Sequence, residues 1–280
     1  MIAPKGATRT LRVTRYRDGT PTKRRDAVVV EEPMEIRLSW FEGGRRRVEP
    51  LAVTMRTPGD DFQLAAGFLF GEGVVTAREE IIALSYCQAP GEQEYNVVEV
   101  RLSPGVVVDW ASLERNFYTT SSCGVCGKAS LDAVDARGCS MLESGLVLDA
   151  SMVAGLPGRL GEEQGVFART GGLHAAGLFD IGGAASPVME DVGRHNAVDK
   201  VVGHAFLGGM LPASDRILVV SGRASFELVQ KAIAAGIPML VAVGAPSSLA
   251  VDLAVRFGQT LVGFARDGAF NVYAGPERIS

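Results

Sequence analysis

Two cysteines, Cys123 and Cys126, lie three positions apart in a stretch rich in serine and glycine, residues 121–128 (SSCGVCGK). A free cysteine has a pKa of about 8.5, and a Cys-x-x-Cys setting or a nearby cation lowers it. Lys128 is such a cation, and the glycines let backbone N–H groups approach a sulfur. The pattern is typical of dithiol–disulfide exchange, of half a zinc site, and of a thiolate that carries sulfur as a persulfide. Packing of two small apolar side chains is the plain alternative.

The zinc interpretation lacks its usual companions. Deaminases that use zinc pair a Pro-Cys-x-x-Cys with an upstream His-x-Glu. All three histidines of this chain follow the cysteine pair, and the residue directly before Cys123 is a serine and not a proline. Cys87 and Cys139 could complete a site of four sulfurs, although neither belongs to a second Cys-x-x-Cys. A thioredoxin-like motif would follow the first strand of a small domain, whereas this one lies in mid-chain. We therefore expect no permanently bound metal and keep zinc as an alternative.

A second group of polar residues, 190–200 (EDVGRHNAVDK), marks the start of a predicted helix over 193–207. The first amides of that helix would face a ligand or be capped by Asp191. Arg194 and Lys200 could hold a phosphate there, and His195 could be a donor, a base or a ligand. A well-capped helix with a solvated charged face explains the same residues equally well.

Short polar turns follow three predicted strands in succession, at 221–225 (SGRAS), 244–248 (GAPSS) and 264–268 (FARDG). Ligands of α/β sheets bind at the carboxyl ends of strands, where helix N-termini also point. A further Gly-Gly turn in 169–174 (RTGGLH) could cradle an anion through its amides, or be a plain turn. The arrangement predicts a ligand that carries phosphate, bound by Gly171, Gly172, His174, Arg194, His195, Ser221 and Arg223.

The elements that must position these residues change along the chain. In the second half, strands at 175–180, 216–220, 237–243 and 260–264 alternate with helices at 193–207, 225–235 and 247–257, which favours a mostly parallel sheet with helices on its faces. The first half is strand-like at 10–17, 27–31, 35–41, 51–56 and 95–102. A short apolar helix is predicted to begin at Thr57 as N-cap, with Pro58 in its first position. The Arg45-Arg46-Arg47 run is expected in a solvated loop.

Composition excludes several classes of protein. The chain has 280 residues, with 28 basic and 32 acidic side chains and a net charge of −4. A nucleic-acid-binding protein usually shows a basic excess, and four cysteines are too few for a disulfide scaffold. The start of the chain has no apolar signal region, and the uncharged stretch 232–251 is broken by glycine and proline. We expect a cytoplasmic protein with no nucleic acid and no membrane as partner.

Taken together, these segments resemble the FdhD family, the sulfur-carrier accessory proteins of formate dehydrogenases. The resemblance rests on 122–128 (SCGVCGK), 170–175 (TGGLHA), 190–200 (EDVGRHNAVDK), 221–225 (SGRAS) and 260–266 (TLVGFAR), with 56–61 (RTPGDD) in agreement. The run around Gly193-Arg194-His195-Asn196 is the most specific part. One departure is Gly244, where the family pattern has serine, and it weakens any role for a hydroxyl at that position.

The resemblance implies a cytidine-deaminase-like α/β fold, a mixed sheet with flanking helices beside a smaller β-rich N-terminal part. We expect that β-rich part at 1–118, the sulfur-carrier loop at 119–130 and a cofactor-binding α/β domain at 131–280. The resemblance also implies that a cysteine desulfurase delivers sulfur to Cys123 as a persulfide, assisted by Cys126. The sulfur then passes to the molybdenum cofactor Mo-bis(molybdopterin guanine dinucleotide) for formate dehydrogenase. The matching cofactor-binding stretch is Phe264, Ala265, Arg266, Asp267, Gly268 and Ala269.

Further implications concern ligands and assembly. Family members are homodimers, and GDP is expected to mimic part of the cofactor. An exposed loop suits a thiolate that must visit two partners. Two alternatives stay open: a non-catalytic chaperone that binds the cofactor and docks it on the enzyme, and a zinc-binding deaminase-like protein.

Overall fold

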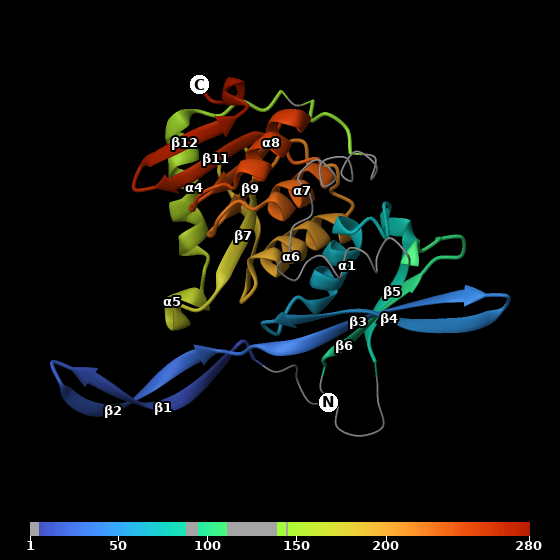
Figure 1. The fold of residues 1–280 in the computed structure, drawn as a ribbon, viewed down its shortest axis with the longest axis horizontal. Coiled ribbons are helices and arrows are strands. Elements are labelled where there is room, and N and C mark those ends of the chain that lie inside the picture. Colours follow the sequence, from blue (N-terminus) through green and yellow to red (C-terminus); the bar gives the residue numbers. More distant parts are fainter. Residues whose placement is uncertain (1–5, 88–94, 111–138, 144) are drawn as a thin grey trace.

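The computed structural model describes residues 6–87, 95–110, 139–143 and 145–280. Within them the chain forms a two-stranded, a four-stranded and a six-stranded sheet with helices packed around the larger two (Figure 1). The predicted α/β class, a mixed sheet with flanking helices beside a smaller β-rich N-terminal part, is confirmed. The predicted boundaries at 118 and 130 lie outside the described residues and stay a prediction.

The N-terminal half contains six strands in the described residues: β1 (Thr8–Arg17), β2 (Thr20–Val29), β3 (Glu32–Glu42), β4 (Arg45–Arg56), β5 (Ile81–Tyr86) and β6 (Val97–Leu102). β1 and β2 pair only with each other, and the others form the sheet of order β4-β3-β6-β5. β2 begins seven residues before the predicted strand at 27. Asp18 and Gly19, both with positive φ, close the β1–β2 hairpin in the manner of an Asp-Gly turn.

Two sequence expectations in this half are wrong. Arg45-Arg46-Arg47 lies not in a loop but at the start of β4, paired with β3 across the hairpin. Thr57 is not a helix N-cap, because helix α1 (Asp61–Gly71) begins four residues later behind Asp60, which has a left-handed backbone. Gly59, at φ 118°, allows the chain to turn there. Thr57 instead faces the C-terminal half, where its Oγ1 accepts a hydrogen bond from Val192 N at 3.3 Å.

The C-terminal half is built on a six-stranded sheet of order β12-β11-β10-β9-β7-β8. Its strands are β7 (His174–Phe179), β8 (Ala185–Asp191), β9 (Ile217–Val220), β10 (Met239–Ala242), β11 (Thr260–Arg266) and β12 (Ala269–Ala274). The three central strands β9, β10 and β11 are parallel, and the other pairings are antiparallel. The expectation of a mostly parallel sheet is therefore wrong, since β8 and β12 return through short turns that only antiparallel neighbours allow.

Helices cover both faces of this sheet. They are α4 (Ala150–Glu162), α5 (Phe167–Thr170), α6 (Arg194–Leu207), α7 (Phe226–Ala234) and α8 (Ser248–Phe257), with short 3-10 turns at η1 (Arg78–Glu80) and η2 (Pro276–Arg278). The predictions for α6, α7 and α8 are confirmed to within a residue or two. α4 was not predicted because glycines and Pro157 lower its helix propensity. Asp149 caps α4 by accepting a hydrogen bond from Ser151 N at 2.8 Å.

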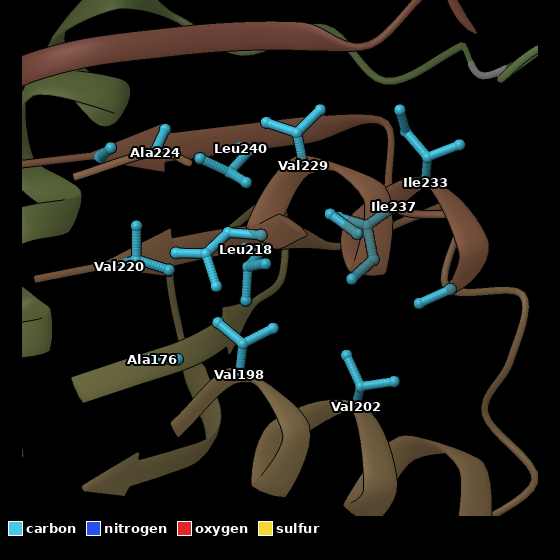
Figure 2. Packing of buried hydrophobic residues seen from close by; sticks show 14 of the residues in the cluster. Ala176, Val198, Val202, Leu218, Val220, Ala224, Val229, Ile233, Ile237 and Leu240 are labelled. Atoms are coloured by element: carbon cyan, nitrogen blue, oxygen red, sulfur yellow. The ribbon is translucent and has the colours of Figure 1, made fainter. Parts of the chain in front are cut away.

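Alternation along the central strands divides the core between the two faces. Leu218 and Val220 of β9 pack with α6, α7 and α8, as the close view shows for Val198 and Val229 (Figure 2). Ile217 and Val219 point the other way, into the cluster under α4. Because successive side chains of a strand face opposite sides, the short apolar run of β9 supplies both layers. A third cluster fills the space between α1 and the four-stranded sheet.

The N-terminal and C-terminal halves meet where α1 crosses α6. A Cβ on Gly67 would lie 1.9 Å from Asp199 O, and one on Gly203 would lie 1.9 Å from Gln63 O, so the two backbones touch. Buried ion pairs flank this crossing: Lys231 Nζ lies 2.5 Å from Asp199 Oδ1, and Lys200 lies against Asp191. We call β3–β6 with α1 the N-terminal lobe, and the six-stranded sheet with its helices the C-terminal lobe.

Candidate functional site

The turns that follow β9 and β10 lie side by side at one edge of the six-stranded sheet, next to Phe264 of β11. Ala224 N donates to Ala245 O at 3.2 Å, and Gly244 N donates to Gly222 O at 2.9 Å. Phe264 N then donates to Gly244 O at 3.1 Å, which brings in β11. The segments 221–225 and 244–248 meet as predicted, as the parallel order of their strands requires. Of the segment 264–268 only Phe264 takes part, because β11 continues to Arg266 and its turn lies at Asp267 and Gly268. We call this region, with the neighbouring ends of β7 and α6, the strand-end cluster.

His174 and Ser221 bring the start of β7 into the strand-end cluster. Ser221 Oγ accepts a hydrogen bond from Ala175 N at 2.9 Å, and Ser221 N donates to Ala175 O at the same distance. A Cβ on Gly222 would lie 3.4 Å from His174 Nδ1 and 3.9 Å from Arg194 Cδ. The sequence pattern placed these residues on separate segments, and antiparallel pairing of β7 with β9 brings them together.

Arg194 has the geometry expected of an anion-binding residue. Its Nε is buried, and among the described residues no hydrogen-bond acceptor lies within reach of it. α6 begins directly at Arg194 behind Gly193, which has no side chain to cap the helix. Ser225, the N-cap of α7, makes no capping bond either, but there the Glu227 carboxylate accepts a hydrogen bond from its own backbone N–H, so it is the start of α6 that directs N–H groups and partial positive charge outwards. An anionic oxygen at this point would satisfy these donors.

His195 lies between two side chains of α7 rather than in open solvent. Its Nε2 is 3.3 Å from Ser225 Oγ and 3.5 Å from Glu227 Oε2. The hydrogen bond from His195 outweighs partial burial and lowers the pKa of Glu227 to about 2. Glu227 was not predicted as part of the site. An acidic residue in the first turn is what any helix start favours, so its sequence position carried no special signal.

His174 is held as a neutral side chain at neutral pH. Burial lowers its pKa below the usual 6.5, and the neighbouring Arg194 and His195 lower it further. Asp191 acts in the opposite direction and does not cancel them. A neutral imidazole next to an arginine can accept or donate a hydrogen bond, and it gains a proton when a negative charge arrives.

The stretch 264–269 divides into two parts. Phe264 has a left-handed backbone, with φ 52°, and its side chain is 39% exposed beside Gly244. Ala265 of β11 is buried in the hydrophobic cluster under α4, whereas Arg266, Asp267, Gly268 and Ala269 form the exposed hairpin end between β11 and β12. Asp267 and Gly268 both have positive φ, as a tight hairpin requires. The structure thus places Arg266 beyond the strand-end cluster on an extension of β11.

Gly171 and Gly172 terminate α5 next to this cluster. Gly171, at φ 66°, is the helix C-cap, and its N–H donates to Phe167 O at 2.7 Å. Gly172 N donates to Thr170 Oγ1 at 3.4 Å. Both amides therefore have acceptors already, and a part for these glycines in cofactor binding stays a prediction without further geometric support.

Asp191 and Lys200 anchor the site rather than line it. Asp191 is fully buried and accepts hydrogen bonds from Gly193 N, from Asn196 Nδ2 and from Thr57 N of the N-terminal lobe. Lys200 Nζ lies 2.8 Å from Asp191 Oδ2 and is 1% exposed. The expectation that Lys200 holds a phosphate is wrong, because its ammonium group is buried and forms an ion pair with Asp191. The alternative of a solvated charged face on α6 is also wrong for Asp191 and Lys200, because both side chains are buried.

Cys123 and Cys126, the predicted sulfur-carrying pair, lie outside the described residues. Of the other cysteines, Cys87 Sγ lies 3.8 Å from Glu99 Oε2, and Cys139 packs against the core below α6, α7 and α8. Among the described residues, no group of three or more His, Cys, Asp or Glu side chains is placed to hold a metal ion. In the same part of the chain, none of the helices has the length and apolar character that a membrane crossing requires.

Comparison with known proteins finds similar sequences that match nearly the whole chain. The family model described as FdhD/NarQ family matches residues 29–280. A relative from Streptomyces avermitilis, named sulfur carrier protein FdhD, is 56% identical and covers 96% of this chain and 94% of its own. One of the same name from Mycobacterium tuberculosis is 51% identical over 92% and 93%. A crystal structure from Desulfotalea psychrophila, of a protein assigned provisionally as a formate dehydrogenase accessory protein, aligns with a TM-score of 0.74 and 26% identity over 98% of this chain and all of that one. From the sequence match and the shared fold, we conclude that this chain belongs to the FdhD/NarQ family.

Proposed function

We propose that this chain is a sulfur carrier that receives sulfur from a cysteine desulfurase as a persulfide on Cys123. It passes that sulfur to Mo-bis(molybdopterin guanine dinucleotide), the cofactor of formate dehydrogenase, and works as a cytoplasmic homodimer. The names of its relatives support the carrier role, and the Cys-x-x-Cys supplies the chemistry.

The strand-end cluster is the observation that carries the substrate assignment. The proposed acceptor bears phosphates, and the cluster offers a buried Arg194 Nε with no acceptor among the described residues, beside the start of α6, which lacks a side-chain cap. Arg223 adds a second, exposed guanidinium on the neighbouring turn. His174 and Ser221 complete a set of donors of the kind that holds a diphosphate.

The sulfur transfer balances without an external oxidant. The Cys123 thiolate attacks the outer sulfur of the desulfurase persulfide, so that one S–S bond forms as another breaks and the desulfurase leaves as a thiolate. In the delivery step the Cys126 thiolate attacks the inner sulfur of the Cys123 persulfide. This closes a Cys123–Cys126 disulfide and releases the outer sulfur as hydrosulfide, two electrons more reduced, to the acceptor. A cellular dithiol then reduces the disulfide.

The first prediction concerns the carrying residue. After incubation with a cysteine desulfurase and cysteine, the intact protein should gain about 32 Da for one sulfur atom, and a thiol reductant should remove it. Cys123→Ala should abolish this gain, whereas Cys126→Ala should retain it and block release. Cys87→Ala is the matched control and should load like the unaltered chain. Normal loading of Cys123→Ala would remove that residue from the role.

The second prediction concerns the nucleotide end of the substrate. GDP should bind and raise the thermal midpoint in a saturable manner, since a ligand that binds only the folded state stabilises it. Arg194→Ala should weaken GDP binding about tenfold or more, as expected for one charge-assisted contact. Arg216→Ala is a matched control because Arg216 precedes the same strand β9 at its opposite end. Equal loss in both variants, or no shift with GDP at about millimolar concentration, would contradict the assignment.

A non-catalytic cofactor chaperone is the second candidate. Its support is the strand-end cluster, whose groups would hold an anionic cofactor whether or not sulfur is transferred. Formate dehydrogenase activity that survives replacement of both Cys123 and Cys126, but fails with Arg194→Ala, would favour the chaperone over the sulfur carrier.

A further inference from the structure

The β1–β2 hairpin, residues 8–29, projects from the body of the molecule as a free-standing ribbon that we call the arm (Figure 1). Its strands pair residue by residue from Thr8 with Val29 to Arg17 with Thr20. At about 3.3 Å per residue, ten residues span roughly 33 Å. No residue of the arm is buried, and none belongs to the three hydrophobic clusters. Since an isolated two-stranded hairpin is marginally stable in water, the arm would gain from a surface to lie on.

The arm is strongly basic. It carries two acidic residues and seven basic ones, namely Arg9, Arg12, Arg15, Arg17, Lys23, Arg24 and Arg25. Arg12 lies directly opposite Arg25 across the two strands, an arrangement that costs stability in a lone hairpin. The twisted ribbon forms a shallow hollow of about 580 Å³ lined by Arg12, Val13, Thr14, Lys23, Arg24 and Arg25. Such a surface is complementary to an acidic one.

The remainder of the same chain carries the complementary net charge. The arm has a net charge of +5, so a chain with a net charge of −4 leaves −9 on the residues outside it. Within the described residues, the main contact of the arm with its own body is at its base, where β2 lies against α5. Val29 lies there 3.2 Å from the position that a Cβ on Gly172 would take. The rest of the arm points away from the body that it complements in charge.

We propose that the arm of one copy docks on the acidic body of a second copy, and that the exchange is reciprocal. Tyr16, which is 70% exposed near the tip, is the apolar anchor of this contact. The family match begins at residue 29, at the base of the arm, so the family description covers the body and not the arm. The inference deepens the proposed homodimer by assigning it an interface, and it is independent of the sulfur transfer.

Sedimentation equilibrium of the full chain tests this proposal. The dimer dissociation constant should rise about tenfold or more between about 50 mM and 500 mM salt, because the attraction is between exposed charges. Arg12→Glu with Arg25→Glu should raise it by about tenfold or more at low salt. Arg45→Glu with Arg47→Glu makes the same change of charge on the other long hairpin, and should leave the constant within about twofold.

A zero-length carbodiimide cross-link identifies the contact directly. In a mixture of unlabelled and heavy-isotope-labelled chains, Lys23 should be joined to an Asp or Glu of the other isotopic form. Lys23→Arg keeps the charge and should remove that cross-link alone.

Three results would overturn the proposal. If the unaltered chain is a monomer, the arm serves a foreign acidic protein instead. If the chain dimerises and Arg12→Glu with Arg25→Glu makes no difference, the homodimer stands and the arm is not its interface. Cross-links of Lys23 found only within one chain would also contradict it. Persulfide loading of Cys123, measured on the same samples, reports separately on the sulfur-carrier function.

Discussion

At the scale of single residues, burial and neighbouring charge both act against protonation of His174. Burial and the neighbouring Arg194 and His195 keep its pKa below 6.5, so the unliganded site carries one positive charge fewer at neutral pH than its residues could give. A bound phosphate favours the protonated imidazole, because an opposite charge nearby stabilises it. Binding of an anion and uptake of a proton are therefore linked at this residue.

The third prediction follows from this linkage. As pH falls from 7 towards 6, GDP should bind more tightly and take up protons, because bound phosphate raises the depressed pKa of His174. His174→Gln should take up fewer protons at pH of about 6. Calorimetry in two buffers of different ionisation enthalpy measures the uptake, and the nucleotide's own titration is common to both proteins.

His204→Gln is the control for this experiment, since His204 lies in the last turn of α6, at the opposite end of that helix from Arg194. Equal proton uptake by the unaltered chain and His174→Gln would refute the linkage. In the absence of ligand, a fall in pH weakens folding, whereas it strengthens the binding of GDP. A depressed histidine pKa makes the folded chain less stable as pH falls below 6.5, because the unfolded chain binds more protons.

Residue patterns could predict part of the site and not the rest. Ser221 and Arg223 were recognisable because they follow a buried strand at the edge where ligands of such sheets bind, Arg194 because it opens a polar helix start, and His174 because it follows a Gly-Gly turn. Lys200 could not be separated from Arg194, since only the fold shows that its amine pairs with Asp191 inside the protein. The sulfur-carrier role of Cys123 and Cys126 stays a prediction from the Cys-x-x-Cys pattern and the family.

At the scale of elements, the crossing of α1 over α6 depends on two residues without side chains. Gly203 lies where any Cβ would collide with Gln63 O, and Gly67 is its counterpart on α1. Neither contact is visible in hydrophobic periodicity, which reported α1 only as a buried apolar helix. The helix was found but its first residue was placed three positions early, at Pro58 instead of Asp61, because Thr57 and Pro58 form an ordinary helix-start signal.

The fourth prediction tests this crossing. Gly203→Ala should lower the free energy of unfolding by about 3 kcal/mol or more, because backbone must move to admit the methyl group. Gly158→Ala lies in α4 with open space around it and should change the free energy by less than about 1 kcal/mol, in the stabilising direction. Urea denaturation of both variants provides the comparison. Similar stability of the two would show that the helices are not in close contact.

At the scale of the whole molecule, Asp191 connects the two lobes and the site. It holds Thr57 of the N-terminal lobe, the Gly193 turn that starts α6, and the charge of Lys200, all without exposure to solvent. The α/β class followed from the alternation of strands and helices in the second half of the chain. The joint between lobes did not, because buried polar contacts between residues far apart in sequence leave no local pattern.

The fifth prediction is that the lobes unfold together. Both tryptophans, Trp40 and Trp110, pack in the core of the N-terminal lobe, whereas circular dichroism reports the helices of both lobes. The two signals should follow one urea transition in the unaltered chain. Asp191→Asn leaves Lys200 buried without its partner charge, and should cost about 3–5 kcal/mol. Adding Lys200→Met to Asp191→Asn should recover part of that loss, and no recovery would contradict the ion pair as the joint.

The close contact of α1 with α6 also bears on how the protein is made. During synthesis α1 leaves the ribosome long before α6, which begins at Arg194, more than 120 residues further along the chain. Until then the apolar surface of α1 that packs on α6 has no covering, and nascent chains in that condition are the ones that attract chaperones. Translation pauses that delay residues 194–207 should therefore lower the yield of soluble protein more than equal pauses placed after residue 207.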